Sequence, residues 1–505
     1  MKRKRVAKQA APESANVLKM KEGSMKRLLF FLPILFLLAF LSSSHAQLAG
    51  VIGSSGGGAA GAATPGLVQR VSVNMVYMPT KYTSIKIPLP NPTLANNCLI
   101  VRVLFDYTNV TVAVSDDKSN TKWAAAKNVP DSSNGVQQSA WVCPGIAAGT
   151  QYITFTFGGS VAATAYFSCD IDEWCGIVTS SAVDNAQGNI SNGTAPATTT
   201  NVSPTQTGDL IWMGIAQDSL SAPGAGCTFN AGSHSNITWA LQPLSTNSTD
   251  GCAVQAGQYS VTTAFKPAFG TCTSANWLVC AVALKTATAG TARPAGIRIV
   301  AIAHYDLTGL SSGTTLKTVT SGNLQAALIT SGTAITGITS TRGSWSNWQS
   351  ASGTSGGGYA VLTDSVNQSA GSQTLTVSFT AGGNTDVMLL DIIGAATSPR
   401  DNGSVLNNQN QTTGTYFTGL TVTPVSTPGI ALTANSVNVG TLENAYAGPG
   451  WAVNGYGQPL PADTPLDQNN GFGVAAYSTT SGITFTWNES AQVGTWCGVI
   501  GTYHQ

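Results

Sequence analysis

The sequence has few charged residues. Lys, Arg, Asp and Glu together make up 9% of its 505 residues, whereas about a quarter is usual for a globular protein. Solubility must therefore come from Ser, Thr, Asn and Gly. This composition favours strands joined by tight turns, because Thr and Val suit a pleated surface while Gly and Asn suit turns. It also suits an extracellular surface.

The chain lacks a basic surface once its N-terminal segment is set aside. Residues 1–46 hold nine of the 23 Lys and Arg residues, which leaves 14 basic and 20 acidic residues downstream. Such a thinly charged, mildly acidic chain has no cationic patch for phosphate backbones, so nucleic acid is excluded as a partner. No cofactor is predicted.

Long apolar runs are missing except near the N-terminus. Two cations after Met25, the run Leu28–Leu41 and a small-residue end at Ala46 are typical of a secretory signal cleaved after Ala46. An uncleaved membrane anchor is the alternative, but about 14 apolar residues fall short of the roughly 20 that cross a bilayer. We therefore expect a secreted or cell-surface protein, without a membrane span in the mature chain.

Histidine and glutamate are scarce downstream of this segment. Three of each remain, and no GxSxG motif follows a strand, so a Ser–His–Asp hydrolase is close to excluded. No two CxxC or histidine pairs have the spacing of a zinc site. The remaining residues are His234, His304, His504, Glu173, Glu443 and Glu489.

The nine cysteines of an exported chain are free to form disulfides. Eight lie in the first part of the chain, consistent with four bridges of undetermined connectivity, and Cys497 stands alone near the end. Cys169 could also pair with Cys175 and staple a turn. The eight disulfide candidates are Cys98, Cys143, Cys169, Cys175, Cys227, Cys252, Cys272 and Cys280.

Short β-patterned runs follow one another from Leu67 onward. Several alternate apolar and polar residues, as half-buried strands do, and no downstream stretch sustains a helical period. The preceding Gly/Ala/Ser tract, residues 47–66, is predicted to be a flexible tether. The sequence therefore predicts an all-β protein.

The run of strands occurs twice in the same order. DLIWMGIA, CAVQAGQYSV and SANWLVCAVALK are followed at similar spacing by GIALTANS, FGVAAYSTTS and VGTWCGVIGTYH, and NCLIVRVLF corresponds to NLQAALITS. We infer two copies of one module, residues 67–286 and 293–505, joined by a linker at 287–292. About 200 residues would make too large a single flat sheet, so each copy is predicted to be an antiparallel β-sandwich of jelly-roll type.

These strands also carry a resemblance. NCLIVRVLF, the SDDKSNTKW turn, GTQYITFTFGGS, the TSSAVDN corner and SANWLVCAVALK together resemble β-sandwich modules that recur in secreted and surface proteins of bacteria. The resemblance covers most of the first copy and, more faintly, the second, where STRGSWSNW replaces the NTKW turn. It implies a fold and a location rather than an activity.

The segment CDIDEWC is the densest acidic cluster in the chain. Asp170 and Asp172 would share one strand face and Glu173 the other. Two carboxylates across a sugar are what glycoside hydrolysis needs, so these three residues are the catalytic candidates. The matching segment of the second copy keeps only Asp391, which favours the alternative that CDIDEWC is a structural strand end.

Two further groups are candidate binding residues. Asp116, Asp117 and Asn120 in the SDDKSN turn offer the oxygen ligands that calcium prefers, although the same residue types also build turns through local hydrogen bonds. Trp345, Trp348 and Trp451 lie among Gly, Ser and Asn, where inter-strand loops are expected, and could stack on sugars. Plugging of the sandwich ends is the alternative role for these rings.

The favoured function is a secreted or surface protein that binds or builds rather than catalyses, with extracellular polysaccharide or cell-surface glycan as the most plausible ligand. One alternative is a polysaccharide hydrolase that uses Asp170, Asp172 and Glu173. Another is a self-assembling adhesin or fibre subunit, since unpaired edge strands can pair with other chains.

Overall fold

The computed structural model describes residues 64–505 apart from gaps. The chain divides into two compact units, 1–52 and 53–505, and every described residue lies in the second. Every regular element of the described residues is a β-strand, which confirms the all-β prediction. None of them forms a helix with the length and apolarity that a bilayer crossing needs. The gaps are 79–81, 106–109, 162–164, 199, 218–228, 230, 246–250, 272–274, 308–313, 321–323, 354–357, 368–370, 381–384, 411–415, 438–441, 448–452, 457–469 and 490–494.

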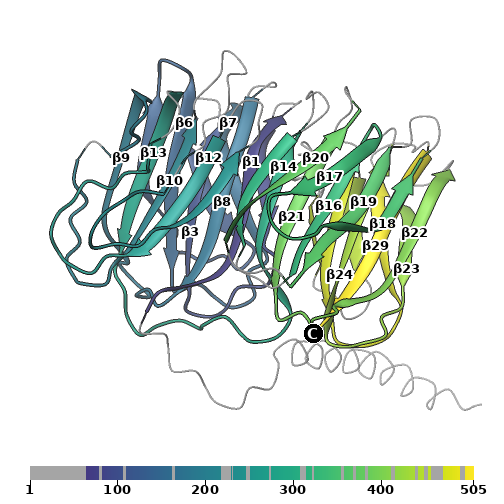
Figure 1. Cartoon of the computed structure of the whole chain (residues 1–505). Coiled ribbons are helices and arrows are strands. Elements are labelled where there is room, and N and C mark those ends of the chain that lie inside the picture. Colours follow the sequence, from purple (N-terminus) through teal and green to yellow (C-terminus); the bar gives the residue numbers. More distant parts are fainter. Residues whose placement is uncertain are drawn as a thin grey trace, which may run out of the picture. The chain divides into compact units, whose positions relative to one another are not determined.

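A ten-stranded central sheet contains strands from both parts of the chain (Figure 1). Neighbouring strands are antiparallel except at the centre, where β1 and β14 pair in parallel. The first half of the sheet has the order β1(Gly66–Met78), β8(Ala165–Cys175), β3(Cys98–Phe105), β6(Val136–Pro144), β5(Ala124–Asp131). The second half has the order β14(Arg298–Asp306), β21(Thr385–Ile393), β16(Leu324–Ser331), β19(Tyr359–Val366), β18(Ser346–Ser352).

A three-stranded sheet, here the small sheet, belongs to each half. The orders 1-8-3-6 and 2-7-4 in the first half are those of a jelly roll, except that β5 pairs with β6 in the central sheet, and the second half repeats this arrangement strand for strand. The first small sheet is β2(Tyr82–Pro88), β7(Tyr152–Val161), β4(Val112–Asp116), and the second is β15(Thr314–Thr320), β20(Gly371–Phe379), β17(Ile335–Ser340).

Each half also has a five-stranded sheet, which adds a layer that the two-sheet sandwich prediction lacked. In the second half, Leu420 and Phe485 of an outer sheet share a core cluster with Trp496 of the five-stranded sheet. The five-stranded sheets are β11(Ala240–Ser245), β12(Gly251–Gln258), β10(Leu210–Gln217), β13(Ala275–Leu284), β9(Val183–Gly193), and β26(Val453–Tyr456), β27(Asn470–Tyr477), β24(Gly429–Val437), β29(Thr495–His504), β22(Arg400–Asn410). The outer sheet is β23(Tyr416–Val422), β28(Ile483–Glu489), β25(Leu442–Ala447).

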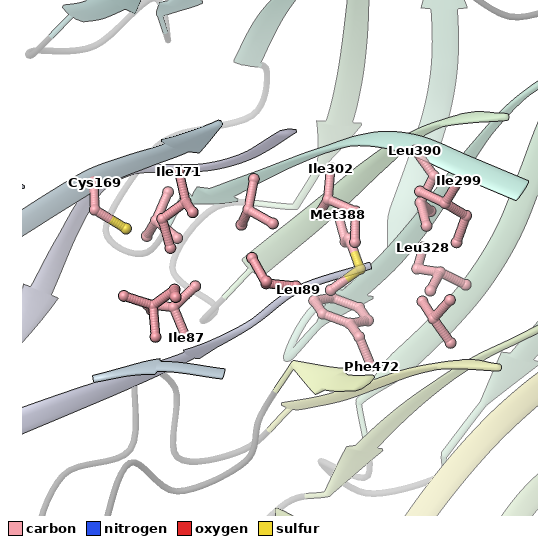
Figure 2. Close-up of a cluster of buried hydrophobic side chains, with 14 of the residues drawn as sticks. Ile87, Leu89, Cys169, Ile171, Ile299, Ile302, Leu328, Met388, Leu390 and Phe472 are labelled. Atoms are coloured by element: carbon pink, nitrogen blue, oxygen red, sulfur yellow. The ribbon is translucent and has the colours of Figure 1, made fainter. Parts of the chain in front are cut away.

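Corresponding sheets of the two halves lie on opposite faces of the central sheet. One core layer joins the first small sheet, through Ile87, to the second five-stranded sheet, through Leu432 and Phe472. The other joins the first five-stranded sheet, through Trp212, to the second small sheet, through Phe379. Figure 2 shows part of the first layer, where side chains from both halves face one another. Because both faces of the central strands are covered, β3 and β16 are buried along their whole length.

This architecture bears on the inferred duplication. Every pair of segments matched in the sequence occupies the same place in the strand order of its half, for example β10 with β24 and β13 with β29. The two halves nevertheless share one sheet and continuous core layers. The division into two domains at 287–292 stays a prediction, as does the tether up to residue 63, which with the signal segment lies outside the described residues.

Candidate functional site

The acidic segment forms the end of β8, an interior strand of the first half of the central sheet. β8 lies between β1 and β3, with Asp170 opposite Ser72 and Arg102, and Asp172 opposite Arg70. Asp170 and Asp172 face the first five-stranded sheet, while Cys169 and Ile171, which alternate with them along the strand, face the first small sheet. Both aspartates have 0% exposure, and Glu173 has 1%.

Asp172 is held by a two-pronged ion pair. Arg70 donates from Nε to Oδ1 and from Nη2 to Oδ2, each at 2.5 Å. The indole N–H of Trp212, on β10, donates to Oδ2 at 2.8 Å, and that of Trp174 approaches the same oxygen at 3.4 Å. Such bidentate, charge-assisted bonds are among the strongest that a carboxylate makes.

Asp170 has a second arginine and a serine as partners. Arg102 donates from Nε at 2.6 Å and the Ser72 hydroxyl donates at 2.6 Å, while Nη2 of Arg102 reaches the Ser168 hydroxyl at 2.8 Å. Arg102 has 0% exposure. Burial alone would lower the pKa of this guanidinium, but Asp170 raises it above its ordinary value, so Arg102 stays charged.

A glycine on β10 makes room for this arginine. A Cβ added to Gly214 would lie 2.6 Å from Cδ of Arg102 and 3.0 Å from the Trp212 ring. Any larger residue would therefore displace the guanidinium from Asp170. The first five-stranded sheet is shaped around the ion pairs beneath it.

Glu173 points to the opposite face and binds the segment before β3. Its carboxylate accepts from the Leu94 backbone N–H at 2.8 Å and from the amides of Asn97 and Gln69 at 2.6 Å each. Burial raises the pKa of Glu173, and these three donors lower it in part. The side chain thus anchors a loop from within the protein.

This arrangement is suited to holding strands together rather than to hydrolysis. A glycosidase needs one carboxyl group that can give up a proton and a second one beside the substrate. Asp170 and Asp172 are each neutralised by an arginine and closed off from solvent. The geometry supports the structural strand reading of CDIDEWC, although not as a stapled turn.

The disulfide prediction is wrong for five of the eight candidates, which are buried free thiols, as is Cys497. The five are Cys98, Cys143, Cys169, Cys175 and Cys280. Cys169 and Cys175 cannot pair because six residues of one extended strand separate them by about 20 Å. Cys98 and Cys143 point into opposite core layers. Cys252 is buried with its sulfur 3.5 Å from the Ser168 hydroxyl, and Cys227 and Cys272 lie outside the described residues.

The calcium candidates hold their own turn. Asp116 accepts from the backbone of Lys118 at 2.8 Å, from the Asn120 amide at 3.0 Å and from the Trp123 indole at 2.7 Å. Asp117 accepts from the backbone of Gln151 at 2.8 Å. These bonds fit the turn-forming role of such residues. Calcium binding here stays a prediction.

Two of the three tryptophan candidates are partly buried. Trp348 packs edge-on against Tyr503, with ring centres 4.8 Å apart, and the Arg400 guanidinium lies 5.7 Å from its ring centre. Trp345 packs against the other core layer. Trp451 lies outside the described residues. Sugar stacking on these rings stays a prediction.

The histidines serve packing and pairing. The His304 Nε2 lies 3.1 Å from a carboxylate oxygen of Asp386 on the neighbouring strand, with both side chains buried. The His234 ring lies tilted against that of Phe265, with 4.7 Å between ring centres.

The residues that neutralise the acids were not identified from the sequence. Arg102 interrupts the apolar run LIVRVLF, and Arg70 interrupts LVQRVSV. A lone arginine inside an apolar strand signals a buried anionic partner, because an unpaired buried charge is very costly. That signal was present, but it does not say which acid is the partner.

Comparison of the chain with protein-family models, curated proteins and solved structures finds no match.

Proposed function

We propose that this protein is a secreted or cell-surface protein that binds neutral glycan on its hydroxyl-rich sheet faces and has no catalytic role. The observation that carries the proposal is the distribution of polar groups. Arginine and aspartate are paired inside, at Arg102–Asp170 and Arg70–Asp172, whereas the outward positions of the small sheets carry mainly hydroxyl groups.

The first small sheet illustrates this face. On β4 the odd positions Ala113 and Ser115 are exposed while Val112 and Val114 are buried. Across the sheet, Thr156 is in register with Ala113 and with Ser84, and Thr154 is in register with Ser115 and Lys86. Each hydroxyl both donates and accepts, which matches the hydroxyl groups of a neutral sugar chain.

The second small sheet presents a similar face. Thr376 on β20 is in register with Thr339 on β17, and Thr339 is exposed. On either side of Thr376, the side chains of Leu375 and Val377 point into the core. Because the two small sheets lie on opposite faces of the central sheet, one chain would present two such faces to separate polymer segments.

The fibre alternative has less support. At one edge of the central sheet, β5 carries Lys127 and Pro130, and both residue types discourage pairing of an edge strand with another chain.

Binding of the full chain to a panel of neutral polysaccharides tests the proposal. We expect co-sedimentation with at least one of them, weakened at least fivefold by Thr154→Val with Thr156→Val. Because valine keeps the β-branched shape, fold and stability should be retained, which circular dichroism checks. The matched control is Thr421→Val on the outer sheet, where Thr421 already bonds Thr484 at 2.6 Å.

Three outcomes would overturn the proposal. They are absence of binding across the panel, binding unchanged by the double variant, and release of sugar that disappears in folded Asp172→Asn. The last result would instead establish the hydrolase.

A further inference from the structure

Two carboxyl groups meet beside the turn at 203–208 that leads into β10. Asp184 lies at the start of β9 and Asp209 directly before β10. The Asp184 side chain is 4% exposed and that of Asp209 is buried. Asp184 accepts hydrogen bonds from the backbone N–H and, at 2.9 Å, from the hydroxyl of Thr205, and so holds the turn.

Neither oxygen of Asp209 has a well-formed hydrogen bond among the described residues, although the Gln206 side chain and the Thr286 backbone lower its pKa in part. A buried ionised carboxylate without a well-formed hydrogen bond would be very costly. A protonated carboxyl group, in contrast, can donate to the neighbouring Asp184, and this contact is the second largest influence on Asp209 after burial. The geometry is therefore that of two carboxyl groups that share one proton.

The other groups around the pair do not replace that proton. Lys285, after β13, lies 3.9 Å from Asp184 and also donates to the Ser181 carbonyl at 3.2 Å. The Gln206 amide donates to the Thr286 carbonyl at 2.8 Å, and the hydroxyl of Tyr259, at the end of β12, donates to Thr263. Of Lys285, Gln206 and Tyr259, Lys285 is the one that carries a positive charge toward the pair.

The second half holds the corresponding turn without a second acid. Asp401, the counterpart of Asp184, accepts from the backbone of Val425 at 2.8 Å and lies 3.4 Å from the Tyr477 hydroxyl. Gly429 stands where the first half has Asp209, and a Cβ there would lie 2.2 Å from that hydroxyl. A phenol thus occupies the place of the Asp209 carboxyl group, and its hydroxyl lies within reach of both the aspartate and the Tyr503 carbonyl, at 3.3 Å from the latter.

We propose that Asp209 and Asp184 form a proton-operated latch, which closes the 203–208 turn onto the first five-stranded sheet at acidic pH and loosens it above neutral pH. The turn at 423–428, latched by Tyr477, does not respond to pH over this range.

The direction follows from proton linkage. Burial first, and then Asp184, raise the pKa of Asp209 to about 7, against about 3.9 for a free aspartate. Burial alone would raise the pKa of Asp184, but the bonds from Thr205 and Asp209 and the charge of Lys285 lower it overall. The latched form therefore holds a proton that the open form releases, and its advantage is lost as pH rises from about 4 to about 7. Burial raises the pKa of Tyr477, so its phenol keeps its proton throughout.

Hydrogen–deuterium exchange of the full chain between pH 5 and pH 8, corrected for intrinsic exchange rates, tests the latch. In the wild type we expect protection of the 203–208 amides to fall about 10- to 100-fold over this range, while the 423–428 amides keep theirs. Asp209→Asn donates an amide hydrogen to Asp184 at every pH, so its 203–208 protection should not vary with pH.

Asp184→Asn provides a second variant should Asp209→Asn fail to fold. Removing the neighbouring charge lowers the pKa of Asp209, so the pH midpoint of protection should move down by at least one unit. Constant protection of 203–208 in the wild type, the wild-type pH dependence in Asp209→Asn, or an unmoved midpoint in Asp184→Asn would each overturn the proposal.

Discussion

The same position in the central sheet holds an ion pair in one half and an apolar pair in the other. Arg102 on β3 is in register with Asp170 on β8, and Leu328 on β16 is in register with Met388 on β21. Arg102 and Leu328 are each the fifth residue of their strand, and each faces the five-stranded sheet of its own half.

The residues around the two pairs differ in a matched way. Arg70 opposite Asp172 corresponds to Ile302 opposite Leu390. Above them, Trp212, which bonds Asp172, corresponds to Leu432, and Gly214, which makes room for Arg102, corresponds to Ala434. The fold is therefore compatible with either a charged or an apolar pair at this position, although in the second half the buried His304–Asp386 pair lies beside it. The charges of the first half are a local solution to packing, and the fold by itself does not require them.

Breaking one ion pair should have the largest effect. Asp170→Met leaves the Arg102 guanidinium buried without its counter-ion, and Arg102→Leu does the same to Asp170. We expect each variant to lose about 3–5 kcal/mol of unfolding free energy, measured by urea denaturation of the full chain. The control Met388→Leu, at the apolar site, should change stability by less than about 1.5 kcal/mol.

Transplanting the apolar pair should restore much of that loss. The double variant Arg102→Leu with Asp170→Met reproduces the Leu328–Met388 pair, and replacing a whole buried ion pair by apolar residues is often neutral or stabilising. We expect it to be more stable than either single variant by at least about 2 kcal/mol. A double variant less stable than both singles would show that the two halves do not tolerate the same layer.

The glycine above the ion pair should matter only while the arginine is present. Gly214→Ala brings a Cβ within 2.6 Å of Arg102, and such overpacking typically costs about 1–3 kcal/mol. In the Arg102→Leu, Asp170→Met background the same change should cost less than about 1 kcal/mol, since Ala434 stands at this position in the second half. Equal costs in both backgrounds would remove the link between Gly214 and Arg102.

Replacing a buried thiol near the network should have the smallest effect. Cys280 on β13 is in register with Gly214 on β10 and corresponds to Val499 of the second half. Burial raises the pKa of its thiol to about 11, so in native protein it should resist alkylation at pH 8. We expect Cys280→Val to change unfolding free energy by less than about 1.5 kcal/mol. A larger loss would show that the contacts of this sulfur with the Gln138 amide at 3.3 Å and the Gly214 carbonyl at 3.6 Å contribute to stability.

The comparison also shows how far the sequence could lead. Strand patterns were enough for the all-β class and for matching segments such as β10 with β24, because alternation and order are local properties. The additional layer left a signal too, since LIWMGIAQ is apolar on both faces and is buried throughout. The parallel pairing of β1 with β14 left no signal in the sequence, because the other neighbour of each strand is antiparallel.

The candidate site was harder to read for a similar reason. Asp170 and Asp172 lie two residues apart on one strand, but their partners Arg70, Arg102 and Trp212 come from three other strands. Their partnership depends on sheet order, which periodicity does not give. The cysteines were assigned to disulfides from compartment and number, whereas those described as free behave as small apolar core residues.

The coupling energy between Arg102 and Asp170 is the most direct test that the acidic strand is a buried, internally neutralised structural element. It is obtained from the unfolding free energies of the wild type, Arg102→Leu, Asp170→Met and the double variant, all measured on the full chain. We expect a coupling of at least about 2 kcal/mol. A coupling within about 0.5 kcal/mol of zero, with both single variants as stable as the wild type, would contradict this account and return Asp170 to the solvent-facing acids that a catalytic site requires.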